Sequence, residues 1–135
     1  MAALNAINHI ALNCWNLAEQ EAFYTKHFGF KRSRTFNRGK PNEFFMLKLG
    51  SIRLELFSSD REKSAGMQGG EQPIGFKHLA FDVPKLEPVI AALQADAIDV
   101  DKIVVVESVP GLRIAFFRDP EGNIIELMEG YRDEE

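Results

Sequence analysis

The chain has 135 residues, of which 45% are hydrophobic, and a formal net charge of −4 at pH 7. This length suits one domain with a sizeable core, and the single cysteine, Cys14, excludes an internal disulfide. We expect a cytoplasmic protein that binds neither membranes nor nucleic acid, because the sequence has no membrane-spanning stretch, no export signal and only scattered basic residues.

The first half of the chain shows strand and helix periodicity in the order β-α-β-β-β. The expected strand at 7–14 is followed by a helix whose apolar residues recur at helical spacing. Asn16 is expected to cap the start of this helix, and Gly29 to end it. Three further strands are predicted at about 30–37, 43–49 and 51–58.

The second half repeats this order after residues 59–75, which lack apolar periodicity and predict a connecting loop. A strand at 76–83 precedes a helix with Pro84 in its first turn and Pro88 still near its start. Later strands are predicted at about 103–108, 112–118 and 123–129. The sequence therefore predicts a single α+β domain, 1–135, made of two tandem β-α-β-β-β modules at about 5–58 and 76–130.

Superposing the two halves tests whether they are duplicates. A shift of 69 residues aligns the following pairs: His9 with His78, Asn13 with Asp82, and Leu17 with Leu86. A shift of 71 residues aligns Glu55 with Glu126. Each half therefore carries one histidine in its first predicted strand and one glutamate in its last.

Strand alternation places these two histidines and two glutamates on one face of the sheet, opposite the face that packs under the helices. Imidazoles and carboxylates that converge on a largely apolar surface fit a divalent metal site, because the ion offsets the desolvation cost of the carboxylates. The alternative is two His–Glu pairs whose members satisfy each other. The same residue types at matching positions of both halves favour the metal site.

Four segments, "INHIAL", "FYTKHFGF", "KHLAFDV" and "FFRDPEGNIIEL", together resemble landmarks of the vicinal-oxygen-chelate superfamily, which includes glyoxalase I, bleomycin-resistance proteins and extradiol dioxygenases. The resemblance covers essentially the whole chain. It implies paired modules that form a cupped mixed sheet with helices on the outer face. It also implies a metal held by His9, Glu55, His78 and Glu126, a ligand set that is similar to that of glyoxalase I-like members.

The resemblance implies a metal-dependent lyase or isomerase that enolises a small substrate chelating the metal through adjacent oxygens. Either Glu55 or Glu126 is the expected general base, and the sequence does not distinguish them. Ni, Zn, Co, Mn and Fe all suit these ligands. Two alternatives stay open: an Fe-dependent ring-cleaving dioxygenase that uses two His and one carboxylate, and a metal-free drug-binding or antibiotic-binding resistance protein.

Four residues are candidates for contact with the substrate: Arg34, Arg53, Phe57 and Arg113. The arginines suit an acidic substrate, although each is equally compatible with an ordinary strand arginine whose stem is packed and whose head is solvated. Glutathione is not expected as a co-substrate. The segment after Glu55, "LFSSDREKS", lacks the Asn-containing stretch that glyoxalase I-like enzymes commonly use to hold it.

A homodimer is expected, because one pair of modules has exposed sheet edges and a large apolar concave face. Each metal site then lies either within one chain or between two chains. We favour the shared arrangement, in which His9 and Glu55 of one chain meet His78 and Glu126 of the other.

Overall fold

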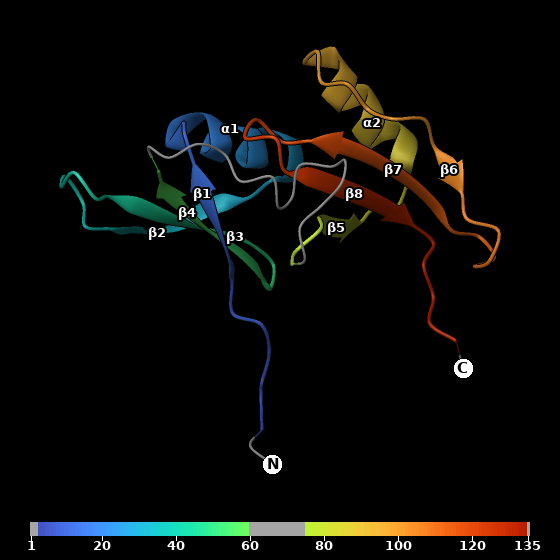
Figure 1. Ribbon diagram of the computed structural model, residues 1–135, viewed down its shortest axis with the longest axis horizontal. Coiled ribbons are helices and arrows are strands. Elements are labelled where there is room, and N and C mark those ends of the chain that lie inside the picture. Colours follow the sequence, from blue (N-terminus) through green and yellow to red (C-terminus); the bar gives the residue numbers. More distant parts are fainter. Residues whose placement is uncertain (1–2, 60–74, 135) are drawn as a thin grey trace. The chain divides into compact units, whose positions relative to one another are not determined.

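The computed structural model describes residues 3–59 and 75–134 and divides into two compact units, Met1–Glu62 and Lys63–Glu135, called module 1 and module 2 below (Figure 1). The described part of module 1 contains β1 (Ile10–Cys14), α1 (Leu17–Phe28), β2 (Lys31–Phe36), β3 (Phe44–Leu49) and β4 (Ile52–Ser58). That of module 2 contains β5 (Leu79–Asp82), α2 (Leu86–Ala95), β6 (Val104–Val105), β7 (Arg113–Arg118) and β8 (Ile124–Glu129).

The two modules have the same sheet topology. The strand order is β1-β4-β3-β2 in module 1 and β5-β8-β7-β6 in module 2. In each sheet the first strand pairs in parallel with the last, and the remaining neighbours pair antiparallel. The predicted fold class is therefore confirmed: the protein is α+β, with two mixed β-α-β-β-β modules.

Each helix packs on one face of its own sheet, where the apolar residues of the last strand are buried. Leu54 and Leu56 of β4, and Ile125 and Leu127 of β8, have no exposed surface. α1 contacts β4 and β3, and α2 contacts β8 and β7. The intervening residues of β4 and β8, which include Glu55 and Glu126, are thus directed to the opposite face. None of the described helices is long and apolar enough to cross a membrane.

The ends of α1 are those that the sequence predicts. The Asn16 side chain accepts a hydrogen bond from the backbone N–H of Glu19 at 3.0 Å, as an N-cap does. Gly29 has φ +76°, a left-handed conformation that ends the helix at little steric cost to a glycine. The prediction for Pro84 was wrong. The helix cap is Lys85, whose backbone is extended, and α2 begins one residue later.

Three predicted strands are too long. β1 and β5 begin immediately after His9 and His78, and the preceding apolar residues, Ile7 and Phe76, are 80% and 85% exposed. β6 has two residues rather than six, because the chain turns at once and Val106 N–H donates to the Leu112 carbonyl at 3.0 Å. The predicted loop at 59–75 lies almost wholly outside the described residues.

Candidate metal centre

Module 1 brings His9 and Glu55 together on the face of its sheet that α1 leaves open. His9 lies immediately before β1, and Glu55 lies within β4, the strand paired with β1. The His9 Nε2 atom is 3.2 Å from Glu55 Oε1. The histidine is partly exposed, whereas the glutamate is mostly buried. The pair therefore presents one imidazole and one carboxylate at the sheet surface.

Module 2 forms the equivalent pair from His78 and Glu126. His78 Nε2 is 2.9 Å from Glu126 Oε1, and only 8% of Glu126 is exposed. The Phe116 ring meets the His78 ring edge-on, with 5.5 Å between ring centroids. Phe116 is the ladder partner of Glu126, so an aromatic ring lies beside both members of the pair.

The His and the Glu of each pair occupy the same positions in the strand ladders of the two modules. A chance similarity of the two sequences would not produce this match. In module 1, Ala11 is the partner of Glu55 across the β1–β4 ladder, and His9 lies two residues before it. In module 2, Ala80 is the partner of Glu126 across the β5–β8 ladder, and His78 lies two residues before it. The duplicated fold therefore builds the same His–Glu geometry twice.

The donor chemistry of the module 1 pair fits a cation. His9 Nδ1 is 2.9 Å from the side-chain oxygen of Asn8, so Nδ1 is placed to donate its proton there. In that tautomer Nε2 carries a lone pair and can bind a cation beside the Glu55 carboxylate, and a metal-bound histidine characteristically donates its other N–H in this way.

One module supplies too few ligands for a metal site by itself. Protein metal sites of this kind use three or four imidazole or carboxylate ligands, and each His–Glu pair provides two. Across residues 3–59 and 75–134 the structure shows no group of three or more His, Cys, Asp or Glu side chains arranged to hold an ion.

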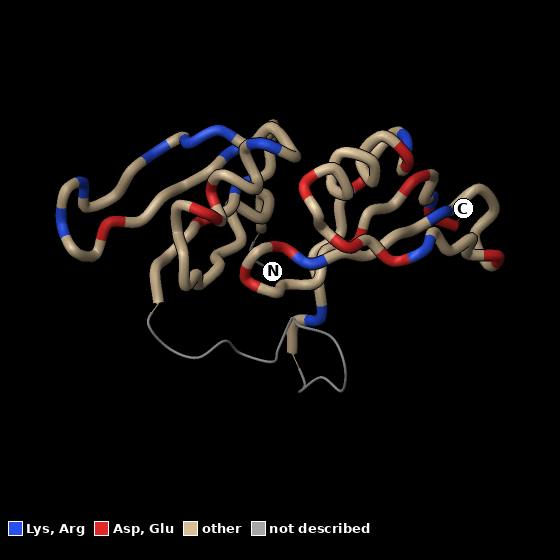
Figure 2. Tube along the Cα trace, turned by 90° about the horizontal axis from the view of Figure 1, so that it is seen from above, with Lys and Arg blue, Asp and Glu red and all other residues tan. Residues whose placement is uncertain are grey.

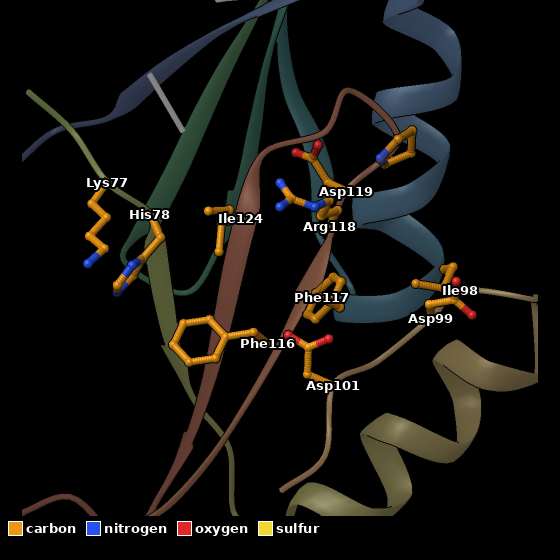
Figure 3. A pocket seen from close by; sticks show the side chains of 11 residues that line it. Lys77, His78, Ile98, Asp99, Asp101, Phe116, Phe117, Arg118, Asp119 and Ile124 are labelled. Atoms are coloured by element: carbon orange, nitrogen blue, oxygen red, sulfur yellow. The ribbon is translucent and has the colours of Figure 1, made fainter. Parts of the chain in front are cut away.

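A pocket of about 670 Å³ adjoins His78 in module 2 (Figure 3). Figure 3 shows His78, Phe116 and Ile124 at one part of its wall, and Ile98 and Asp99, from the segment after α2, at another. The wall thus combines aromatic and aliphatic surface with charged groups beside the imidazole. This is the composition expected of a small-molecule site.

Three of the predicted substrate residues lie on the same sheet face as Glu55. Arg53 and Phe57 flank Glu55 at alternate positions of β4. Arg34 is joined to this row through Met46, which is its partner in the β2–β3 ladder and the partner of Glu55 in the β3–β4 ladder. Their contact with a substrate stays a prediction.

Arg113, the fourth predicted substrate residue, is not brought to the face that carries Glu126. It is the ladder partner of Glu129, which alternates with Glu126 and therefore faces the helix side of the sheet. Its guanidinium donates to both Glu129 carboxylate oxygens, at 2.8 and 2.7 Å, and forms an ion pair with Glu87 at 2.7 Å. Arg113 thus links α2 to β8.

The Arg113 network predicts acid sensitivity. Hydrogen bonds from Arg113 and from the Leu86 backbone N–H lower the pKa of Glu129 from an ordinary 4.5 to about 2. A lowered pKa stabilises the fold above the unfolded value, so this contribution is complete above about pH 4.5 and is lost as the pH falls toward 2. We expect Glu129→Gln to lower the melting temperature at pH 7, and the difference from wild type to shrink progressively below pH 4.5 in thermal unfolding.

The matched control for this prediction is Glu107→Gln, which removes an exposed carboxylate outside the Arg113 network. Its melting temperature should stay within a degree or so of the wild type at both pH 7 and pH 3. A Glu129→Gln difference that was as large at pH 3 as at pH 7 would show that the ion pair does not carry the effect.

Sequence reasoning identified Arg53 and Phe57 beside Glu55 but missed Phe36, Phe44 and Lys48. Phe36 stacks on Phe44 with ring centroids 4.6 Å apart, and Phe44 stacks on Phe57 at 4.3 Å. Lys48 is the ladder partner of Arg53. Alternation within "EFFMLKL" does place Phe44 and Lys48 on one face, but only the strand register shows that this is the face of Glu55.

Comparison with known proteins identifies similar sequences and folds along nearly the whole chain. The family model described as the Glyoxalase/Bleomycin resistance protein/Dioxygenase superfamily matches residues 6–127. The uncharacterized protein YwkD of Bacillus subtilis is 31% identical over 128 residues, which cover 93% of this chain and 98% of that protein. YaeR of Escherichia coli, also uncharacterized, is 29% identical over 131 residues, covering 96% and 99%.

Solved structures show the same fold. The glyoxalase family protein from Enterococcus faecalis is 35% identical, with a TM-score of 0.77, over 92% of this chain and 97% of that one. The fosfomycin resistance protein FosX from Listeria monocytogenes has a TM-score of 0.74 over 96% of each chain, but its identity of 17% shows a shared fold only.

Proposed function

The chain belongs to the glyoxalase/bleomycin resistance protein/dioxygenase superfamily, and from this premise we propose that it is a metal-dependent lyase or isomerase of glyoxalase I-like type. The observation that carries the proposal is the repeated His–Glu pair, with Nε2 to Oε1 distances of 3.2 and 2.9 Å in the two modules. Members of the superfamily typically bind a divalent metal. His9, Glu55, His78 and Glu126 are the residues proposed to hold one here.

A divalent metal held by these four residues would polarise the substrate oxygens and make the neighbouring C–H group more acidic. The chain's own residues do the rest. One carboxylate, Glu55 or Glu126, takes the proton as the C–H bond breaks, and the electron pair moves toward the adjacent carbonyl. The same carboxylate then returns the proton to the neighbouring carbon, where a new C–H bond forms. The net reaction is an isomerisation that needs no oxidant or reductant.

Burial suits the two glutamates to this work. Both carboxylates are largely shielded from water, and each has one nearby imidazole as its partner. Aromatic side chains lie near both groups: Phe116 is the ladder partner of Glu126, and the Phe36–Phe44–Phe57 stack shares the sheet face of Glu55.

The experiment is proton exchange in D2O. Metal-loaded protein is incubated with hemithioacetals, 2-oxo acids, acyl-CoA epimers and catechols, and deuterium at carbon is measured by NMR. We expect exchange with a substrate that carries adjacent oxygens, and its loss in the glutamate variant that removes the base, Glu55→Gln or Glu126→Gln. Metal analysis of both variants separates a lost base from a lost ligand.

Two results would contradict the proposal. Oxygen consumption with ring opening of a catechol would identify a dioxygenase instead. Tight binding of an antibiotic such as bleomycin by metal-free protein, with no exchange for any compound, would identify a resistance protein. We expect the hemithioacetal of methylglyoxal and glutathione to react slowly, well below about 10 per second, because the glutathione-holding Asn segment is missing after Glu55.

A further inference from the structure

A basic pocket lies beside the His9–Glu55 pair in module 1. It has a volume of about 260 Å³, and its cationic side chains are Arg34, Lys48 and Arg53, with Phe36 and Met46 as apolar neighbours. The pocket is built entirely within one module, from β2, β3 and β4 together with Asn8, which precedes β1, so its shape follows largely from the β2–β3–β4 register. We call it the cationic pocket.

The three cations of this pocket have no carboxylate partner among the described residues. Two other arginines do have such partners: Arg32 is paired with Glu21, and Arg113 with Glu129. Three positive charges on adjacent strands repel one another, and a bound anion relieves that repulsion while accepting charge-assisted hydrogen bonds. The composition of the pocket therefore points to an anionic ligand group.

The wider charge distribution agrees with this. Residues 3–59 contain eight Lys or Arg and four Asp or Glu, whereas residues 75–134 contain six and twelve (Figure 2). At the position of Arg53, the duplicated module 2 has Ile124, although Arg118 stands where module 1 has Lys48. The pocket beside His78 balances its cations, Lys77 and Arg118, with Asp99, Asp101 and Asp119. A pocket whose charged side chains are all cationic is thus found in module 1.

An aromatic surface continues from the cationic pocket across the same sheet face. Phe36 lines the pocket and begins the stack that runs through Phe44 to Phe57. The Arg34 guanidinium carbon lies 5.9 Å from the Phe36 ring centroid, so charge and ring are contiguous. Along β4 the order is Arg53, Glu55, Phe57 on one face. Glu55 therefore stands between Arg53 and Phe57 on this face.

We propose that the cationic pocket binds the carboxylate or phosphonate of the substrate, while a planar apolar part of the same molecule packs on the Phe36–Phe44–Phe57 stack. This inference rests on the proposed function and defines its substrate class as a small aryl-bearing organic anion. A molecule held at both ends spans Glu55, which brings its central carbons to the candidate base. Substrates without a negative charge bind poorly at this site.

The test measures binding to chelator-treated, metal-free protein by calorimetry, so that it does not depend on the metal site. The probes are benzylphosphonate, which has both groups, methylphosphonate, which has only the anion, and benzyl alcohol, which has only the ring. We expect benzylphosphonate to bind at least tenfold more tightly than either control, and its affinity to fall as salt is raised.

Variants assign the binding to the pocket. Arg53→Gln and Arg34→Gln are each expected to weaken benzylphosphonate binding about tenfold, the usual worth of a charge-assisted contact. Phe57→Leu should leave methylphosphonate unaffected and reduce the preference for the benzyl compound. Arg38→Gln, which removes a cation from the β2–β3 turn outside the pocket, should change nothing. Circular dichroism confirms that each variant is folded.

The outcomes separate this inference from the proposed function. If benzylphosphonate does not bind, or if Arg38→Gln weakens it as much as Arg53→Gln does, the pocket is not a specific anion site and the inference is wrong. Metal uptake by that same protein would leave the proposed function standing. Conversely, specific anion binding by a protein that takes up no metal would support the pocket and reject the metal-dependent reaction.

Discussion

His78→Ala is expected to remove most of the divalent metal that the protein binds, and with it most of the activity. The substitution deletes one of four proposed ligands and leaves the buried Glu126 carboxylate without the imidazole that lies 2.9 Å from it. A metal site that loses one of its four protein ligands typically loses affinity by several orders of magnitude, because water has to take the place of the missing imidazole. The measurement is metal content after dialysis, about one ion per wild-type chain.

The chain offers a matched control in its third histidine. His27 lies in the last turn of α1 and packs against Phe23, with 5.0 Å between ring centroids. His27→Ala should therefore retain the full metal content. Equal metal content in wild type and His78→Ala would overturn the assignment of the ligand set, whereas equal loss in both variants would indicate adventitious binding to surface histidines.

Local sequence signals were sufficient to predict most of the fold. The ends of α1 could be predicted because a capping Asn and a terminal Gly act locally. Asn16 accepts a hydrogen bond through its side chain, Gly29 adopts a left-handed backbone, and neither depends much on the rest of the protein. The burial of Leu54 and Leu127 followed from alternation within single strands. The duplication reinforced both, because each module provides an independent example of the same order.

Strand ends and cross-strand neighbours were less accessible to sequence reasoning. Ile7 and Phe76 look like strand residues, yet pairing begins only at Ile10 and Leu79. A strand ends where its partner ends, and the partner is not specified by local composition. For the same reason the sequence does not predict the ion pair of Arg113 with Glu129, because the ladder that joins them depends on the register of two strands.

The candidate site was predicted through repetition rather than through local pattern. Neither His9 nor His78 has a sequence context that distinguishes a ligand from a buried histidine. The prediction of a metal site rested on the equivalence of His9 with His78 and of Glu55 with Glu126. The matching positions of both pairs in the strand ladders add a geometric argument for that site. The duplication could not reveal the cationic pocket, because module 2 has Ile124 where module 1 has Arg53.

A mixture of two inactive proteins, His9→Ala and His78→Ala, is expected to regain activity when their subunits exchange. We expect each metal site to combine the His9–Glu55 pair of one chain with the His78–Glu126 pair of another. Opposite net charge favours such pairing of module 1 with module 2 over pairing of like modules, since residues 3–59 carry an excess of cations and residues 75–134 an excess of anions.

Counting sites gives the expected size of the recovery. In a heterodimer with shared sites, one site carries both substitutions and the other carries neither, so one of the two sites is active. Random exchange makes about half of the dimers heterodimeric, and the mixture should therefore reach about a quarter of wild-type activity. Native mass spectrometry confirms the heterodimers, and mixing His9→Ala with Glu55→Gln provides the control, because both substitutions affect the same pair and no intact site is formed.

The opposite arrangement predicts a different result. If each site is made within one chain, every site in the mixture keeps one substitution, and activity stays at the level of the separate variants however completely the subunits exchange. Absence of recovery in confirmed heterodimers would therefore reject shared sites while leaving the four ligands intact as a proposal. Recovery would show that both His–Glu pairs act in one site, since neither His9→Ala nor His78→Ala protein contains a complete set on its own.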